Sequence, residues 1–422
     1  MRITILTAGS RGDVQPYVAL GAGLLHAGFQ VRFATHKIFE GFIRQHELDF
    51  APLEGDPRAV VQAPEGRDWL ASGRNPFGFI AGFQRLMGPV MHQAFQDAWA
   101  ACQDADAILV SGLGFYPGHS IAQKLGVPML QAYLQPIHPT SAFPSAIFPL
   151  PLRGHVIYNY LTHVLGGQMF WQAMRPGLNL ARRELLGLPP LPRLGAIVFQ
   201  DLERRRLPVA YGYSPAVLPR PRLWGEWIHV VGYWFLPEAE WTPPAALADF
   251  LAAGEPPVYV GFGSMADRDP ERLAGIVLEA LVRSGQRAVM LTGWGGLKPT
   301  DLQDTVFPLE SAPHDWLFPR MAAAVHHGGA GTTASALRAG VPSIVLPFFG
   351  DQFFWGQVVT RLGVSPGALY RRDLNAGRLA DYICAAVKNP DMRLRAQALG
   401  ERIRLEAGVN RAVALFQRYL QT

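Results

Sequence analysis

A pattern of apolar strands, glycine turns and helices occurs twice along this chain, and it constrains the fold more than any other feature. In the first half, residues 3–7 are apolar and β-branched, residues 9–13 are rich in turn formers, and residues 16–27 have a helical pattern. A second apolar strand follows at residues 31–35. A helix between two such strands returns the chain for parallel pairing, so the segment predicts a β-α-β unit.

The pattern restarts after a passage rich in proline and tryptophan, residues 233–257. The further expected strands are residues 107–110, 129–132, 229–231, 258–262, 288–291, 322–326 and 343–346, and the expected long helices are residues 77–101 and 158–186. We therefore predict an α/β protein with two Rossmann-like parallel-sheet domains that face each other across a cleft. The expected bounds are 1–236, 237–391 and a C-terminal helical segment, 392–422, that packs back toward the first domain.

Composition excludes several classes of protein. Hydrophobic residues make up 49% and charged residues 17%, so the chain can bury a large core and is not disordered. A net charge of +5 over 422 residues is too mild for a nucleic-acid-binding surface. Cys102 and Cys384 lack the spacing of a disulfide framework or a zinc site, and no other cluster suits a metal. Without a signal-like start or a run of roughly 20 apolar residues, the expected location is the cytoplasm.

The most informative loop begins at His326. A Gly-Gly-Ala-Gly turn, residues 328–331, follows the histidine pair, and Thr332 then opens a helix. A helix N-terminus has unpaired N–H groups and a partial positive charge, so it is suited to bind phosphate. His326 can donate a hydrogen bond to a phosphate oxygen, more strongly if it is protonated.

Asp351 and Gln352 follow the next expected strand, residues 343–346. A turn whose glycines only relieve strain would explain the loop after His326, but it would not explain these two polar residues. Ligands of α/β folds bind at the carboxyl ends of strands, so we expect both loops to belong to one site.

These loops resemble the nucleotide-sugar-binding signature of family 1 glycosyltransferases, which are inverting enzymes of the GT-B fold. The strings HHGGAGTT (326–333), AGVP (339–342) and PFFGDQFFW (347–355) are most similar to the branch of sterol glucosyltransferases and of macrolide and glycopeptide enzymes. The opening GSRGDVQPYVALG (9–21) is similar to the first loop of that branch. RPGLN (175–179) and LGLPP (186–190) also resemble the sterol-type enzymes.

The resemblance implies roles for the matching residues. Asp351 and Gln352 would hold the sugar hydroxyls, and His326 would hold the diphosphate together with helix-terminal amides. The expected donor-binding residues are Ser10, Gly12, Ser264, Ala312, His314, His326, Gly329, Ala330, Gly331, Thr332, Asp351 and Gln352. Plant members stack the base on a Trp and bind the ribose with a Glu, where this chain has Ser311 and Ala334. A uridine or a thymidine diphosphate donor therefore stays open, and no cofactor is expected because the nucleotide sugar is a substrate.

Asp13 is the expected catalytic base. Attack of a hydroxyl on an anomeric carbon needs a group that removes its proton, and the first loop contains Asp13 but no histidine. The resemblance places an aspartate in that role in the sterol and antibiotic branch. The residues alone equally allow Asp13 to cap the first helix, where the helix N-terminus would lower its pKa. His26, His36, His92 and His119 are expected to be surface or packing residues.

The acceptor half is rich in aromatic residues. Those expected to line an acceptor site, or else to form ordinary core, are Phe77, Phe83, Met87, Tyr133, Phe143, Phe148 and Trp171. The proline-rich stretch 135–151 carries apolar residues on a loop, which suggests a hydrophobic ligand and peripheral contact with a membrane.

The predicted function is inverting transfer of a hexose, glucose from UDP-glucose in the leading interpretation, to a hydroxyl of a hydrophobic acceptor such as a sterol. The alternative is transfer from a TDP- or UDP-sugar to a polyketide, antibiotic or polyphenol. An NAD-dependent oxidoreductase is a weaker hypothesis, because residues 261–266 fit GxGxxA without a hydride-transfer site. A non-catalytic nucleotide-sugar-binding protein could lose Asp13 or Asp351, and both are present. The sequence does not predict an oligomeric state.

Overall fold

The computed structural model describes residues 1–71, 76–147, 155–237, 241–263, 269–292 and 303–421. The chain forms two compact units. Unit 1 comprises Met1–Val60, Asn75–Leu236 and Ala407–Thr422, and unit 2 comprises Val61–Arg74 and Pro237–Glu406.

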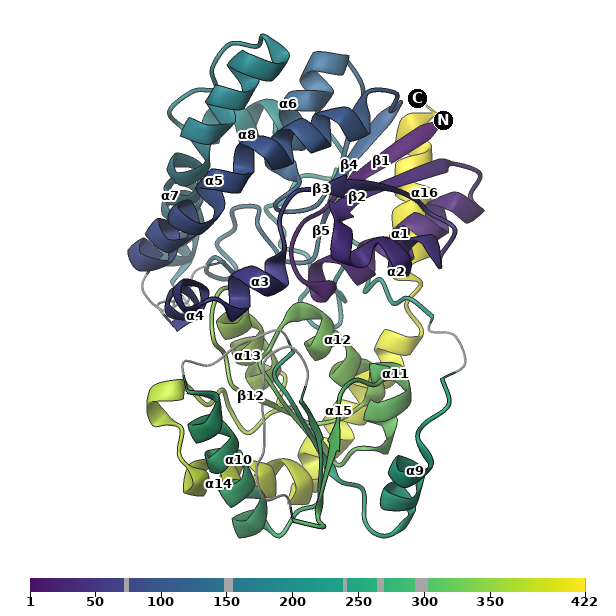
Figure 1. Cartoon of the computed structure of the whole chain (residues 1–422), viewed down its shortest axis with the longest axis vertical. Helices are drawn as coiled ribbons and strands as arrows, with labels where there is room; N and C mark the ends of the chain where they lie inside the picture. The colour runs from purple at the N-terminus through teal and green to yellow at the C-terminus, as the bar shows by residue number, and fades with distance from the viewer. Residues whose placement is uncertain (72–75, 148–154, 238–240, 264–268, 293–302, 422) are drawn as a thin grey trace. The chain divides into compact units, whose positions relative to one another are not determined.

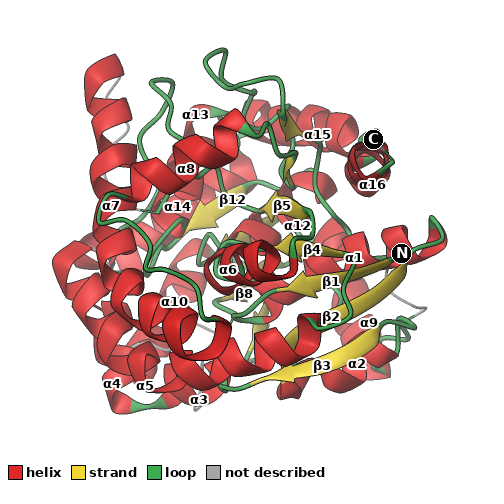
Figure 2. Cartoon of the chain, turned by 90° about the horizontal axis from the view of Figure 1, so that it is seen from above, coloured by secondary structure: helices red, strands yellow, loops and turns green. Residues whose placement is uncertain are grey.

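Unit 1 is built on a parallel sheet of seven strands within the described residues, in the order β3-β2-β1-β4-β5-β6-β7. The strands are β1 (Arg2–Leu6), β2 (Gln30–His36), β3 (Asp49–Leu53), β4 (Ala107–Val110), β5 (Met129–Tyr133), β6 (Val209–Tyr211) and β7 (Ile228–Val230). The central strands β4 and β5 are buried along their whole length and mostly apolar, as expected for a parallel sheet covered on both faces. Figure 2 shows β1, β2 and β3 side by side, in the register Ile3 to Val31 and Phe33 to Phe50.

The helices of unit 1 connect these strands. They are α1 (Arg11–His26), α2 (Glu40–Arg44), α3 (Pro57–Gln62, which extends into unit 2), α5 (Pro76–Cys102), α6 (Phe115–Leu125), α7 (Val156–Ala181), α8 (Gly195–Arg204) and α16 (Gly408–Leu420), with a π-helical turn at Arg182–Leu186. The C-terminal α16 packs against α1 (Figure 1), so closely that a Cβ at Gly23 would lie 2.5 Å from Val409 Cγ1.

Unit 2 has its own parallel sheet, with five strands among the described residues in the order β10-β9-β8-β11-β12. They are β8 (Val258–Gly261), β9 (Ala288–Leu291), β10 (Val306–Leu309), β11 (Ala323–His326) and β12 (Ser343–Val345). The helices are α4 (Pro64–Ala71), α9 (Ala245–Ala252), α10 (Pro270–Ser284), α11 (His314–Leu317), α12 (Ala330–Ala339), α13 (Gln352–Arg361), α14 (Ala376–Lys388) and α15 (Pro390–Arg404). The core between α10, α14 and the sheet includes Val260, Val277, Val325 and Ile383.

The prediction of two parallel α/β sheets is confirmed. The segment 392–422, however, is not one helical piece. Helix α15 contacts α12 and belongs to unit 2, whereas α16 contacts α1 and belongs to unit 1. Residues 61–74, which we expected in the first domain, belong to unit 2, where the ring of Trp69 lies 6.0 Å from that of Phe349.

No helix in the described part of the chain combines the length and the apolar character needed to cross a membrane.

Candidate nucleotide-sugar site and catalytic loop

Three neighbouring strands of unit 2 end at the same edge of their sheet. Strand β11 lies between β8 and β12, and His326, its last residue, pairs with Gly261 on one side and Val345 on the other. The loops that follow these strands therefore start side by side. This is the edge at which open parallel sheets bind ligands.

The loop after β11 leads into the N-terminus of α12. Gly329 is the N-cap residue, and no side chain caps the helix. The predicted residues Ala330, Gly331 and Thr332 form the first three positions of α12, where helix N–H groups lack intrahelical partners. The structure thus provides an uncapped helix N-terminus at the ligand edge of the sheet.

His326 is fully buried beside this terminus. Its Nδ1 accepts a hydrogen bond from the backbone N–H of Gly328 at 3.1 Å, so the neutral ring carries its proton on Nε2. Nε2 has no partner among the described residues. Burial, followed by the nearby His327 and His314, lowers the pKa of His326 to about 3. With this pKa His326 is neutral at physiological pH, so it can act as a donor only through its neutral Nε2–H and not as the stronger, protonated donor.

Sequence reasoning missed His327, which completes this loop. Its ring lies against the backbone of Gly263, in the loop after β8, and against Gly329, where a Cβ would collide with Nε2. Burial lowers the pKa of His327 to about 4. The doubled histidine was a visible signal, but the sequence did not show which loop its ring would contact. The predicted phosphate ligand Ser264 lies outside the described residues.

Asp351 and Gln352 lie where α13 begins, after β12. The Trp355 indole N–H donates to Asp351 Oδ2 at 2.9 Å. The buried Gln352 turns its carboxamide oxygen back onto its own loop and accepts hydrogen bonds from the N–H groups of Phe348 and Phe349, at 2.8 and 3.3 Å. Both predicted sugar-binding residues are therefore held in fixed orientations next to the α12 loop.

Ala312 and His314 follow β10 on the other side of β8. His314 is the first residue of α11, stacks on Phe318 with ring centroids 4.5 Å apart, and lies 3.3 Å from the Tyr259 hydroxyl. Ala312 precedes α11 and packs against the apolar cluster beneath it. The side chain of His314 is thus used to fix α11, which agrees with a ligand contact through backbone atoms.

In unit 1, Asp13 occupies the first turn of α1, directly after the loop that follows β1. Its Oδ2 accepts hydrogen bonds from the backbone N–H and the hydroxyl of Ser10, at 2.9 and 3.0 Å. The bond from the backbone N–H of Ser10, the N-cap residue, is one half of a capping box. Gly12, the second residue of α1, is exposed. The loss of hydration raises the pKa of Asp13 above its ordinary value, although both bonds from Ser10 act in the opposite direction. The expectation that the helix terminus makes Asp13 a weaker base is therefore wrong in sign.

His36 is a second residue that sequence reasoning missed. It ends β2, is 6% exposed, and its Nε2 accepts a hydrogen bond from the Gly9 N–H at 3.2 Å. Burial lowers the pKa of His36, which keeps Nε2 free to accept this bond. The residue therefore ties the loop after β1 to the neighbouring strand, beyond the simple packing role that we expected.

The residues expected to line an acceptor site are mostly core. Phe83, Tyr133, Phe143 and Trp171 are all buried, and Trp171 donates its indole N–H to the Pro192 carbonyl at 3.1 Å. This agrees with the ordinary-core alternative for these four. The side chains of Phe77 and Met87, both on α5, and all of Phe148 lie outside the described residues.

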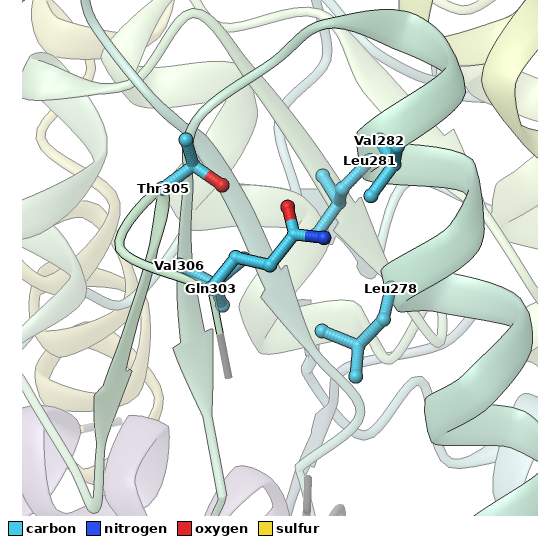
Figure 3. Close-up of a pocket in the computed structure, with 6 residues that line it drawn as sticks. All are labelled: Leu278, Leu281, Val282, Gln303, Thr305 and Val306. Carbon is cyan, nitrogen blue, oxygen red and sulfur yellow. The ribbon is translucent and has the colours of Figure 1, made fainter. Parts of the chain in front are cut away.

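A small pocket lies elsewhere, between α10 and the start of β10 (Figure 3). It is lined by Leu278, Leu281, Val282, Gln303, Thr305 and Val306. Because Val306 is the first residue of β10, this pocket is at the amino-terminal edge of the sheet, opposite to the candidate site. No group of three His, Cys, Asp or Glu side chains in the described ranges is arranged to hold a metal ion.

Both halves of the chain match families of glycosyltransferases or related biosynthetic proteins. Residues 3–125 match the model of the Glycosyltransferase family 28 N-terminal domain, and residues 298–406 match that of the Erythromycin biosynthesis protein CIII-like, C-terminal domain. Over its whole length the chain is 39% identical to a protein of Aspergillus fumigatus named sterol 3-beta-glucosyltransferase, and 38% identical to one of that name from Cryptococcus neoformans. The chain spans only 30% and 27% of the length of these two relatives.

Solved structures with a similar fold include the glycotransferase of kitacinnamycin, with a TM-score of 0.71 and 18% identity over 99% of this chain and 98% of that one. Another is the Streptomyces sp. SF2575 glycosyltransferase SsfS6 in complex with thymidine diphosphate, with a TM-score of 0.64 and 17% identity over 99% of each chain. At these identities the likeness concerns the fold. Together with the two family matches, it shows that the chain is a glycosyltransferase of the GT-B fold, and its sequence is similar to part of the proteins named sterol 3-beta-glucosyltransferase.

Proposed function

We propose that the chain transfers a glucosyl group from UDP-glucose to the hydroxyl of a sterol, with inversion at the anomeric carbon. The observation that carries the donor half of this proposal is the buried Nε2–H of His326 beside the uncapped N-terminus of α12. A buried donor without a partner is costly, and a phosphate oxygen would satisfy it. The relatives named sterol 3-beta-glucosyltransferase support the acceptor class.

In the proposed reaction Asp13 accepts the proton of the acceptor hydroxyl. The hydroxyl oxygen forms a bond to the anomeric carbon as the bond from that carbon to the β-phosphate oxygen breaks, and UDP leaves from the opposite face. The raised pKa of Asp13 favours this role, because a stronger base removes a hydroxyl proton more readily. The proposed reaction needs no cofactor, because the nucleotide sugar supplies the transferred group.

The donor contacts follow from the placement of the loops in unit 2. His326 and the N–H groups of residues 329–332 would neutralise the diphosphate, and Asp351 and Gln352 would bind the sugar hydroxyls. Ser264 would add a phosphate contact, and the backbone at Ala312 and His314 would flank the base. The first-loop residues Ser10 and Gly12 are proposed to contact the donor as well.

The acceptor class implies contact with a membrane surface, because sterols partition into bilayers. We further propose a cytoplasmic location, with which the two free thiols of Cys102 and Cys384 are compatible.

A donor and acceptor panel tests the proposal. UDP-glucose and TDP-glucose are each incubated with a detergent-solubilised sterol and with a polyphenol, and products are identified by mass spectrometry. We expect a sterol hexoside from UDP-glucose, with the β-configuration shown by the anomeric coupling constant. Transfer only from TDP-glucose, or only to the polyphenol, would support the natural-product alternative.

The Asp13→Asn variant tests the assignment of the base. We expect transfer to fall by about 10²–10⁴ while the affinity for UDP, measured by calorimetry, stays unchanged. Wild-type turnover in this variant would exclude Asp13 as the base.

A further inference from the structure

The first three turns of α7 expose apolar side chains to solvent and bury polar ones. Their exposed side chains are apolar, with exposed fractions from 39% to 75%: Val156, Ile157, Tyr160, Leu161, Val164 and Leu165. The buried face carries Asn159, Thr162, His163 and Gly166 instead. A helix at the surface of a globular protein ordinarily shows the opposite arrangement.

Hydrogen bonds to a neighbouring loop fix this orientation. Asn159 Nδ2 donates to the Ser141 carbonyl at 2.9 Å, and Thr162 Oγ1 accepts from the Ser145 N–H at 2.8 Å. His163 Nε2 lies 3.0 Å from the Phe143 carbonyl. These bonds to loop backbone groups hold α7 with its polar side inward and its apolar side outward.

The apolar surface continues onto α8. Leu194 and Ile197, at the start of that helix, are 57% and 51% exposed. Gln168 of α7 joins the two helices, because its side chain donates to the Arg193 carbonyl and accepts from the Gly195 N–H, both at 2.9 Å. We call these eight side chains, six on α7, Leu194 at the N-cap of α8 and Ile197 on α8, the α7–α8 apolar face. Single exposed apolar residues are ordinary, but a contiguous set of this kind marks an interaction surface.

Arginines lie at one end of this face, and the carboxylate one turn beyond Ile197 on α8, Asp201, is paired with Arg205 at 2.9 Å. Helix α7 contains neither Asp nor Glu. Arg175 bonds to Gln172 of α7, and the carbonyl of the exposed Arg193 accepts a hydrogen bond from the same glutamine, so both arginines lie beyond the last apolar turn. In the described part of the chain neither forms an ion pair with a carboxylate. An apolar helical face with arginines at one end is complementary to a bilayer that carries anionic headgroups.

We propose that the α7–α8 apolar face docks onto an anionic lipid bilayer, with its leucine, isoleucine and valine side chains among the acyl chains and Arg175 and Arg193 at the headgroups. Docking would give the enzyme access to a sterol in the membrane, and this benefit rests on the proposed function. The docking itself does not, and it can be measured without any transfer reaction.

Vesicle flotation tests the docking. The full chain is mixed with vesicles of phosphatidylcholine alone or with phosphatidylserine, and the bound fraction is measured. We expect binding to the mixed vesicles, and a loss of about tenfold or more in the variant Leu161→Glu/Leu165→Glu, because two charges would enter the apolar layer. The matched control, Leu223→Glu, changes a 71% exposed leucine elsewhere in unit 1 and should float as the wild type does.

The variant Arg175→Gln/Arg193→Gln tests the electrostatic part. It should lower binding to the phosphatidylserine vesicles and weaken its dependence on salt. Equal flotation of wild type and Leu161→Glu/Leu165→Glu would overturn the proposal, and so would an absence of wild-type flotation. A wild-type dimer in light scattering that this variant converts to a monomer would also overturn it, because a second copy would then cover the face.

Transfer to detergent-solubilised sterol separates this proposal from the proposed function. Leu161→Glu/Leu165→Glu should retain that activity and its UDP affinity, and lose only transfer to sterol in vesicles. Flotation as expected without any transfer would leave the docking standing and remove the proposed reaction.

Discussion

Gly9 and Asp13 are so close that a Cβ atom at position 9 would lie 2.5 Å from Asp13 Oδ2. Gly9 also has a φ of 129°, which side-chain-bearing residues rarely adopt, and its N–H is held by His36. Because Gly9 has no side chain, the Asp13 carboxylate can lie against the backbone of Gly9 and Ser10 in the loop after β1.

Gly9→Ala should abolish most transfer, because the added methyl group displaces the Asp13 carboxylate. Gly28→Ala is the matched control, since Gly28 also has a positive φ, 91°, but an added Cβ would meet nothing within 4 Å. Both variants should lose stability through backbone strain, on the order of 1–2 kcal/mol. Only Gly9→Ala should lower kcat, and similar losses of kcat in both would contradict the proposed contact.

Asp13 should reduce the stability of the fold at neutral pH. Its folded pKa is raised, so its contribution to stability is present below the unfolded pKa and is lost as the pH rises through the folded value. Asp13→Asn should therefore raise the midpoint of thermal unfolding at pH 7, on the order of 1–3 °C, and the gain should shrink as the pH approaches 4. Calorimetric scans at several pH values measure this, and a lower midpoint than wild type at pH 7 would contradict the raised pKa.

Trp355→Phe should weaken binding of the sugar but not of the nucleotide. The change removes the N–H that holds Asp351 Oδ2 and keeps an aromatic ring in the core. Loss of a hydrogen bond to a charged group is worth about 1.5–3 kcal/mol, so the affinity for UDP-glucose should fall by roughly 10–100-fold. The affinity for UDP, measured on the same sample, should hold within twofold. A parallel fall in both affinities would point to a general loss of structure in unit 2.

His36→Ala should lower kcat with little effect on UDP affinity, because His36 acts on Asp13 through Gly9 and lies in unit 1. Removing the acceptor of a backbone N–H costs about 1–3 kcal/mol when that group stays buried. His36→Gln offers a carboxamide oxygen at a similar reach, so we expect part of the activity to return. If alanine and glutamine behave alike, the hydrogen bond from Gly9 does not position the loop.

Three of the described strands, β3, β6 and β10, were not predicted from the sequence, and two of them share a physical cause. β3 and β10 are the outer strands of their sheets, and each contains a proline, Pro52 and Pro308. Proline is tolerated at an edge because no neighbour needs its missing N–H, but it removes the local strand signal. β6 has only three residues and depends on pairing with β5 and β7. The apolar inner strands were predicted because burial on both faces leaves an unbroken apolar run.

The site could be predicted as far as local sequence determines it. A glycine turn after a strand gave the α12 N-terminus. The start of α1 was predicted too late, at residue 16 with Asp13 as the cap, because turn-forming residues occupy the first turn of a helix whose N-cap is Ser10. The direction of the Asp13 pKa shift could not be read, because lost hydration depends on what the rest of unit 1 packs around the carboxylate. The contact of His36 with Gly9 joins residues 27 positions apart, so no local sequence pattern predicts it.

Because the C-terminal helix α16 packs against α1 of unit 1, it limits where segments can be exchanged to make hybrid proteins. A segment exchanged between relatives from residue 237 to the C-terminus would place a foreign helix against Gly23 of α1. Exchange of residues 237–406, with the native final helix retained, would preserve that fit. Hybrids that swap sugar specificity should therefore be joined at two seams, and single-seam hybrids should be recovered mainly as insoluble protein.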